Sequence, residues 1–346
     1  MVDKLKPNDP RVQSLTANVR GKTYKYILAK PEGDKPPRAT ALLIHGWPDL
    51  GFGWRYQVPY LTSLGLQVIV PDMLGYGGTD APQDVGLYSL KNIADDMAEL
   101  VAHVTAGDGD ADGDGRIILG GHDWGGMAAW RLANWHPSLI RGVFSVCTPY
   151  MPPRPEYADL DTVVRMLPNF RYQVQLAGPD VEREVGSDPD KIRGLLTGIY
   201  GARGPAKEHV FTTDKGVIFE NLDKMGESPL LSGDEVDFYV EQYARNGMRG
   251  PLNWYRTRRV NYEEELALLQ DGKAPKLTMP ALVVVAEQDP ALPPRMSEGM
   301  EAHFDSLKRA TVGGTHWALW DSTADVNAAI GKFVEDVLSK PVKSSI

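Results

Sequence analysis

Short, almost continuous apolar runs recur along the chain and form its most visible pattern. They lie at residues 39–44, 67–71, 117–120, 143–147 and 281–285. A strand that is apolar on both faces is typical of a parallel sheet that helices cover on both sides. The runs therefore predict the central strands of such a sheet.

Longer segments with a helical period alternate with these runs. Between residues 90 and 104 the apolar residues recur at i, i+3, i+4 and i+7, and Ser89 stands where a helix N-cap is expected. Further helices are predicted from Met127 onward, directly after two glycines, and over residues 326–337. Alternating strands and helices indicate an α/β fold with a largely parallel sheet.

The middle of the chain departs from this alternation. Residues 151–155 read Met-Pro-Pro-Arg-Pro, which is typical of a linker, and the segment that follows is predicted to be mostly helical. The strand pattern returns near Met279. We therefore predict a core domain made of residues 1–149 and 263–346. Residues 150–262 are predicted to form a helical cap over the carboxyl ends of the strands, where open α/β sheets bind their ligands.

Composition narrows the class of protein. The 346 residues include 37 Lys and Arg against 46 Asp and Glu, a net charge of −9, which argues against binding to nucleic acid or to an anionic membrane surface. The single cysteine, Cys147, excludes an internal disulfide and a Cys-rich zinc site, and its apolar surroundings predict a buried position. Neither a signal peptide nor an uninterrupted membrane-spanning stretch is visible, so we expect a cytoplasmic protein without membrane insertion.

One segment, residues 107–115, is unusually rich in Gly and Asp and imitates the start of a calcium-binding loop. Such a loop needs a bidentate Glu at its twelfth position, where this chain has Leu119. We therefore expect an acidic surface loop. No metal and no other cofactor is predicted for the chain.

The pentapeptide Gly-His-Asp-Trp-Gly at residues 121–125 carries the clearest chemical signal. It lies between a predicted strand and a predicted helix, which is the context of the nucleophile elbow G-x-S-x-G, with Asp123 in place of serine. The tight turn accepts only small residues two positions before and after the nucleophile, as Gly121 and Gly125 provide. Taken in isolation, the pattern fits equally well a glycine-rich turn in which Asp123 caps the helix.

An earlier segment, His-Gly-Trp-Pro at residues 45–48, follows the strand predicted at 39–44. In α/β-hydrolases the loop after this strand supplies one backbone N–H of the oxyanion hole, and Trp47 N–H is the candidate here. Trp124 N–H, directly after the nucleophile position, is the other candidate. Alone, the segment is explained as well by an ordinary turn with a buried histidine, but the elbow downstream strengthens the catalytic interpretation.

Two further residues complete a catalytic triad in the chain order nucleophile, acid, histidine. Asp289 follows the strand predicted at 281–285, and His316 lies on a loop after the strand-like residues 310–312. Glu287 is a rival acid that stands nearer the strand end. Alone, His316 would be interpreted as a structural histidine, but the order along the chain favours catalysis.

An aspartate nucleophile implies its own chemistry. A carboxylate is already ionised near neutral pH, so it needs no base to activate it. We expect displacement at an sp³ carbon to give an alkyl ester on Asp123. His316, oriented by Asp289, then deprotonates a water molecule that attacks the ester. Epoxides and haloalkanes are the two substrate classes that fit this sequence of steps.

With these motifs the chain resembles, over nearly its whole length, the soluble epoxide hydrolases of the α/β-hydrolase fold, of the fungal kind. Two segments of the predicted cap, residues 169–173 and 249–256, share the resemblance. In that family each carries a tyrosine aimed at the epoxide oxygen, which implies this role for Tyr172 and Tyr255. Pattern alone would assign either tyrosine to an amphipathic core position. The resemblance also implies a cis peptide bond before Pro48.

This interpretation also gives expectations for the residues of the substrate pocket and for the binding partners. We expect His45, Pro48, Trp124 and Trp317 to line the pocket. The expected partners are a small hydrophobic epoxide and water, and the chain is expected to act as a monomer or a weak homodimer.

Two other functions stay open. A haloalkane dehalogenase with the same nucleophile needs N–H donors for halide, often an Asn at the position of Trp47, and fluoroacetate dehalogenases carry Arg at the position of Trp124. These departures and the tyrosine pair favour an epoxide. A non-catalytic small-molecule-binding protein on this fold would need a broken triad, whereas all three members are present.

Overall fold

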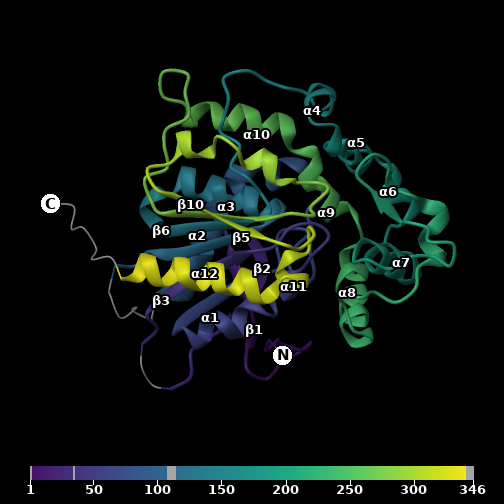
Figure 1. Cartoon of the computed structure of the whole chain (residues 1–346), viewed down its shortest axis with the longest axis horizontal. Coiled ribbons are helices and arrows are strands. Elements are labelled where there is room, and N and C mark those ends of the chain that lie inside the picture. Colours follow the sequence, from purple (N-terminus) through teal and green to yellow (C-terminus); the bar gives the residue numbers. More distant parts are fainter. Residues whose placement is uncertain (1, 34–35, 107–113, 340–346) are drawn as a thin grey trace.

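A mixed eight-stranded sheet forms the centre of the protein (Figure 1). The computed structural model describes residues 2–33, 36–106 and 114–339. The strand order is β1-β2-β4-β3-β5-β6-β9-β10, in which β1 and β2 are antiparallel to their neighbours and the other strands run parallel. The strands of this sheet are β1 (Gln13–Val19), β2 (Lys22–Ala29), β3 (Ala39–Ile44), β4 (Leu66–Pro71), β5 (Ile117–His122), β6 (Ile140–Val146), β9 (Ala281–Ala286) and β10 (Leu307–Val312).

The sequence pattern located the middle of the sheet but missed one edge. The five apolar runs correspond to β3, β4, β5, β6 and β9, which are buried along their whole length. Strands β1 and β2 were not predicted, because their positions alternate between buried and exposed and no continuous apolar run marks them. The predicted α/β fold with a mostly parallel sheet is confirmed.

Helices pack on the sheet in two pairs. Helix α2 (Leu90–Thr105) contacts α3 (Trp124–Trp135), and α1 (Gln57–Ser63) contacts α12 (Thr323–Leu338). The short α11 (Ala318–Asp321) precedes α12. The predicted N-cap of α2 is confirmed, because the Ser89 hydroxyl accepts the N–H of Asn92 at 3.2 Å.

A mostly helical segment lies between β6 and β9. Figure 1 shows α5 to α8 grouped on one side of the core. The predicted domain boundary at residue 262 falls within α10. The inserted elements are α4 (Leu160–Met166), α5 (Tyr172–Ala177), α6 (Asp180–Glu184), α7 (Pro189–Ile199), β7 (Phe211–Thr212), β8 (Gly216–Val217), α8 (Gly233–Asn246), α9 (Arg249–Asn253) and α10 (Arg258–Glu265).

Hydrogen bonds join the inserted segment to loops at the carboxyl ends of the strands. The indole N–H of Trp254 donates to the carbonyl of Leu74, just after β4, at 3.0 Å. The indole N–H of Trp317, after β10, donates to the carbonyl of Ile199 in α7 at 3.1 Å. The insertion therefore covers the edge of the sheet where all the loops with catalytic motifs emerge.

Two further expectations concern membrane insertion and the acidic loop. Among the described residues, no helix combines the length and the apolar character that a membrane span requires. Residues 107–113, most of the predicted acidic loop, lie outside the described residues.

Candidate active site

Asp123 occupies a sharp turn between β5 and α3. Its φ of 54° and ψ of −125° place it outside the usual regions for a non-glycine residue. A Cβ atom at Gly125 would lie 2.0 Å from the carbonyl oxygen of Ile44, and one at Gly121 would lie 2.1 Å from that of Gly125. Although Asp123 precedes the helix, its side chain makes no capping hydrogen bond, so the helix-cap interpretation is wrong. The turn instead presents the carboxylate to neighbouring loops.

The Asp123 carboxylate has one partner on each oxygen. Oδ1 accepts the backbone N–H of Trp47 at 2.8 Å, and Oδ2 lies 3.5 Å from Nε2 of His316. The Trp47–Pro48 peptide bond that follows is cis. The first predicted oxyanion donor therefore already contacts the carboxylate, and the other oxygen is left to react.

The acid behind His316 is Asp289 and not Glu287. Asp289 Oδ2 lies 2.7 Å from Nδ1 of His316, while its Oδ1 accepts the N–H groups of Ala291 and Leu292 at 2.8 and 2.9 Å. Asp289 is buried, whereas Glu287 is exposed. The two backbone donors fix the carboxylate, which in turn fixes the orientation of the imidazole.

In this triad the acidic groups and the imidazole shift one another's pKa. Burial lowers the pKa of His316, but the charge of Asp289 and hydrogen bonds with Asp123 and Asp289 outweigh it and raise the pKa to about 10. For Asp289, burial raises the pKa, and the charge and hydrogen bond of His316 together with the backbone donors bring it below its usual value. His316 therefore lies between two acidic groups that favour its protonated form.

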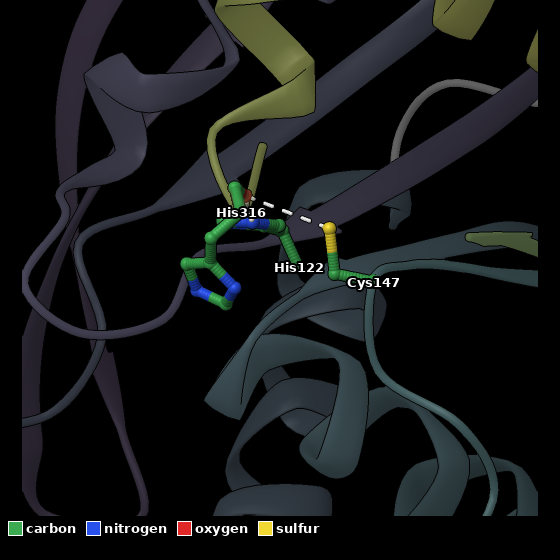
Figure 2. A group of neighbouring side chains, drawn as sticks. All are labelled: His122, Cys147 and His316. Atoms are coloured by element: carbon green, nitrogen blue, oxygen red, sulfur yellow. Dashed lines mark hydrogen bonds between the residues drawn. The ribbon is translucent and has the colours of Figure 1, made fainter. Parts of the chain in front are cut away.

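Two residues that sequence reasoning left out of the site hold the backbone of His316. Figure 2 shows His122 and Cys147 next to it: His122 Nε2 lies 2.8 Å from the His316 carbonyl oxygen and Cys147 Sγ lies 3.5 Å from it. Because a carbonyl only accepts, Nε2 of His122 carries the proton, and burial lowers the pKa of this ring to about 4. A signal was available, since His122 ends β5 and Cys147 directly follows the adjacent strand β6.

These three residues also form the one group of possible metal ligands among the described residues, with donor atoms within 4.8 Å of one another. Both ring nitrogens of His316 face carboxylates, and His122 Nε2 is bonded to a carbonyl. Burial raises the pKa of the Cys147 thiol well above its usual value, which disfavours the thiolate a metal would need. The chemistry of the donor set therefore fits a neutral positioning contact and not a metal centre.

The inserted segment contributes two buried tyrosines. Tyr172 opens α5 and Tyr255 follows α9, and their ring centroids are 6.3 Å apart. The Tyr255 ring packs edge-on against the indoles of Trp47 at 5.7 Å and Trp124 at 5.2 Å. Burial first, then neighbouring charge including that of Asp123, raises the pKa of both phenols. Both hydroxyls therefore keep their protons at neutral pH.

A cavity of about 390 Å³ joins these groups, and Asp123, Trp124, Tyr172 and Tyr255 all line it. Three residues that were expected in the pocket do not line this cavity. His45 is buried and its Nε2 accepts the N–H of Met73, the carbonyl of Pro48 accepts the Tyr200 hydroxyl, and Trp317 stacks on Trp320 at 4.9 Å. Pro48 and Trp317 thus contact the inserted segment, at Tyr200 and Ile199, and His45 contacts the loop after β4.

Comparisons with known proteins agree with this geometry. A family model described as the alpha/beta hydrolase fold matches residues 42–186. The chain is 43% identical to the epoxide hydrolase srdG of Neurospora crassa, over 97% of this chain and 99% of that protein. It is 31% identical to bifunctional epoxide hydrolase 2 of Rattus norvegicus, over 88% of this chain, and spans 53% of that protein.

Solved structures support the fold. Epoxide hydrolase VrEH1 from Vigna radiata superposes with a TM-score of 0.77 at 24% identity, covering 94% of this chain and 98% of the other. The fold and the site define an α/β-hydrolase that has a carboxylate in the place of the nucleophilic serine. Given the 43% identity with srdG over nearly the full length of both proteins, the chain belongs to the epoxide hydrolase family of this fold.

Proposed function

We propose that the protein hydrolyses epoxides to vicinal diols through a covalent ester on Asp123. The observation that carries the proposal is the cavity in which this carboxylate, held by Trp47 N–H, faces two buried phenols. Oδ2 of Asp123 attacks a ring carbon, and the electron pair of the breaking C–O bond moves to the epoxide oxygen. Tyr172 and Tyr255 donate hydrogen bonds to this oxygen, and one of them supplies its proton.

The second step releases the diol. Forming the ester removes the negative charge of Asp123, so the pKa of His316 falls and the imidazolium can lose its proton. This proton restores the tyrosinate of the first step to a phenol. The neutral His316, held by Asp289, then takes a proton from a water molecule that attacks the ester carbonyl carbon. Negative charge develops on Oδ1, which the N–H groups of Trp47 and Trp124 stabilise. When the tetrahedral intermediate collapses, the C–O bond to the substrate breaks and the hydroxyl proton of the intermediate moves to the leaving oxygen. The diol leaves, and the carboxylate is restored with one oxygen from water.

The same cavity disfavours the haloalkane alternative. A leaving halide needs no proton, whereas an epoxide oxygen becomes an alkoxide that does. Two protonated phenols that line the same cavity as the nucleophile suit the alkoxide. A non-catalytic binding protein is disfavoured as well, because the contacts among Asp123, His316 and Asp289 are complete.

The covalent intermediate is the sharpest test. In His316→Gln, Asp123 still alkylates but water lacks its base, so intact mass spectrometry with excess styrene oxide should show a one-to-one adduct. A wild-type control should show no lasting adduct. An unmodified His316→Gln protein under conditions where the epoxide is bound would refute the two-step route.

An isotope experiment tests the origin of the diol oxygen. In a single turnover in ¹⁸O water, the oxygen added to the diol should be ¹⁶O from Asp123, and the label should appear in the peptide containing Asp123. A first-turnover diol that carries ¹⁸O would mean direct attack by water.

We further propose that residues 150–262 act as the cap domain on a core of residues 1–149 and 263–346, and that the protein works in the cytoplasm as a monomer or a weak homodimer. The chemistry needs one chain only, since every proposed catalytic group comes from the same molecule. Sedimentation at increasing concentration, paired with activity, tests the oligomeric state, and fractionation of cells that express the protein tests the location.

A further inference from the structure

A turn directly after β6 contacts the backbone of two residues of the triad. The Sγ atom of Cys147 lies 3.5 Å from the carbonyl oxygen of His316 (Figure 2). The hydroxyl of the next residue, Thr148, donates to the carbonyl oxygen of Asp123 at 2.7 Å. One turn therefore touches both the loop of the proposed nucleophile and the loop of the proposed base, and none of the steps proposed above uses the Thr148 hydroxyl.

The backbone of this turn is strained and is held by its neighbours. The N–H of Thr148 donates to the carbonyl of Val146 at 2.9 Å and closes a three-residue turn, in which Cys147 has a φ of 67°. A γ-turn with a positive φ is rare and unfavourable, and such strain persists only where the surrounding contacts impose it. Cys147 N–H donates to the carbonyl of Val284 in β9 at 2.8 Å. The Thr148 carbonyl accepts the indole N–H of Trp130 at 3.0 Å, so the backbone that carries the Thr148 hydroxyl is fixed on both sides.

The carbonyl that accepts the Thr148 hydroxyl belongs to the peptide group between Asp123 and Trp124. This peptide group is trans and planar, so its C=O and its N–H point in opposite directions and turn together. Holding the Asp123 carbonyl therefore also sets the direction of the Trp124 N–H, which is the second predicted oxyanion donor.

Two N–H groups of α3 bind the same carbonyl. Gly126 N–H and Met127 N–H donate to it at 2.9 and 3.2 Å, and these bonds belong to the first turn of the helix. The Thr148 hydrogen bond is shorter and comes from the segment after the neighbouring strand. A Cβ atom at Gly126 would lie 2.8 Å from Thr148 Oγ1, so glycine at this position permits the close approach. Thr148 thus ties the peptide group to the sheet, independently of α3.

The Trp124 nitrogen lies near the oxygen atom that it would stabilise. A Cβ atom at Gly46 would lie 2.3 Å from Asp123 Oδ1 and 2.7 Å from the Trp124 nitrogen, so both atoms face the same glycine. Oδ1 already accepts the N–H of Trp47. In the proposed hydrolysis of the ester this oxygen gains negative charge, whereas alkylation removes charge from the carboxylate. A well-aimed Trp124 N–H should therefore matter more for the second step than for the first.

We propose that Thr148 is a positioning residue for hydrolysis of the ester: its hydroxyl holds the peptide group of Asp123 and Trp124 so that the Trp124 N–H points at the developing oxyanion. This inference rests on the proposed function. The hydrogen bond to the carbonyl also polarises the amide, which makes the N–H a stronger donor. The hydroxyl transfers no proton in either step, so its removal should slow hydrolysis without stopping it.

The test separates the two steps in Thr148→Val, which keeps the shape of the side chain and removes the hydroxyl. With styrene oxide, quench flow should show hydrolysis of the ester slowed about tenfold, in line with one lost hydrogen bond, and alkylation within about twofold of the wild type. The ester should therefore accumulate during turnover more than in the wild type, which intact mass spectrometry detects. Thr148→Ser keeps the hydroxyl and should restore hydrolysis to within about threefold of the wild-type rate.

Thr197→Val is the matched control. Thr197 is also buried, and its hydroxyl donates to a backbone carbonyl, that of Arg193 in α7, at 2.9 Å and away from the cavity. Both rates should stay at the wild-type level in this variant. If circular dichroism shows that Thr148→Val does not fold, Thr148→Ala and Thr148→Ser form a second pair that differs in the hydroxyl alone and should give the same contrast.

Three results would overturn the positioning role. These are alkylation slowed as much as hydrolysis, hydrolysis unchanged without the hydroxyl, and hydrolysis that Thr148→Ser does not restore. With normal turnover by the wild type, each of them leaves the proposed function intact. A wild type that forms neither the ester nor the diol would overturn the proposed function and this inference together.

Discussion

The reactive groups come from two parts of the molecule. We call the residues that follow strands of the sheet the core wall and the residues of the inserted segment the cap wall. The two walls hold their reactive groups in different ways. On the core side each group follows a strand and has a fixed hydrogen-bond partner: Trp47 N–H on Asp123, and Asp289 on His316. On the cap side Tyr172 and Tyr255 come from short helical turns and are positioned by ring packing, Tyr255 against both Trp47 and Trp124.

This difference has a chemical consequence. In the proposed mechanism each core group has a separate task, so its removal should stop one step completely. The two cap hydroxyls are proposed to share a task, so either should compensate in part for the other. A single substitution on the core wall should therefore reduce the rate as strongly as a double substitution on the cap wall.

The largest effect is expected on the core wall. Asp123→Ala removes the only atom that bonds to the substrate carbon, so turnover of styrene oxide should fall by more than about a thousandfold. The same variant should still bind the diol product, which isothermal titration calorimetry can measure. Residual turnover near the wild-type level would show that water attacks the epoxide directly and that the core wall is not decisive.

On the cap wall the double variant Tyr172→Phe/Tyr255→Phe should nearly abolish alkylation, because the alkoxide is left without a donor in a site with little water. Each single variant loses one hydrogen bond to a developing charge, about 1.5–3 kcal/mol, or roughly a 10- to 100-fold slower alkylation. Single-turnover quench flow measures these rates.

A matched control separates chemistry from packing. Tyr150→Phe also removes a buried phenol hydroxyl, one that bonds to Asn134 away from the cavity. Its alkylation rate should stay at the wild-type level. If the double cap variant alkylated as fast as this control, the cap tyrosines would be packing residues and the preference for an epoxide over a haloalkane would lose its main support.

The two steps should also differ in their dependence on pH. With a pKa of about 10, His316 is protonated throughout the neutral range in the free enzyme, so alkylation should change little between pH 6 and 8. In the ester state the pKa of His316 is lower, and the group must be neutral to act. Hydrolysis of the ester should therefore slow as the pH falls through that lower pKa.

The coupling behind this pH effect can be measured directly. Asp123→Asn removes the same charge that ester formation removes, so the pKa of His316, followed by nuclear magnetic resonance of the imidazole, should fall relative to the wild type. An unchanged pKa would mean that Asp289 alone sets the protonation of His316.

The smallest effect is expected for a hydrogen bond that links the inserted segment to the loop carrying Trp47. The Tyr239 hydroxyl, from α8, donates to Asp49 Oδ1 at 2.6 Å, and Asp49 belongs to the loop that carries Trp47. Burial raises the pKa of Asp49 to about 7, so this carboxylate depends on its few donors. Tyr239→Phe should slow ester hydrolysis by about fivefold, in line with one neutral hydrogen bond, and alkylation by less. Equal slowing of the two steps would indicate general loosening and not displacement of the oxyanion donor.

Prediction from the sequence was most accurate where local chemistry leaves few choices. Asp123, between Gly121 and Gly125, was open to two readings, and the absence of a capping hydrogen bond decides against one of them. Asp289 was preferred to Glu287 because Glu287 stands nearer the strand end, and burial with two backbone donors supplies the physical reason.

Prediction was least accurate where side-chain direction matters. His45, Pro48 and Trp317 stand in the right loops, but they do not line the cavity. Arg131 and Arg258 line it, although nothing in their local sequence marks them. Spacing assigns a residue to a face of its own helix, but which neighbour covers that face depends on elements far away in the chain.

The sequence by itself determined the strand–helix alternation, the inserted segment and the order of the triad, because these follow from periodicity and from glycines that a tight turn requires. Only the tertiary structure decided which groups interact electrostatically, which form hydrogen bonds and which line the same cavity. The raised pKa of His316 needs Asp123 and Asp289, which are far apart in the chain, at contact distance. Electrostatic and packing energies depend on distance in space, and folding alone sets that distance.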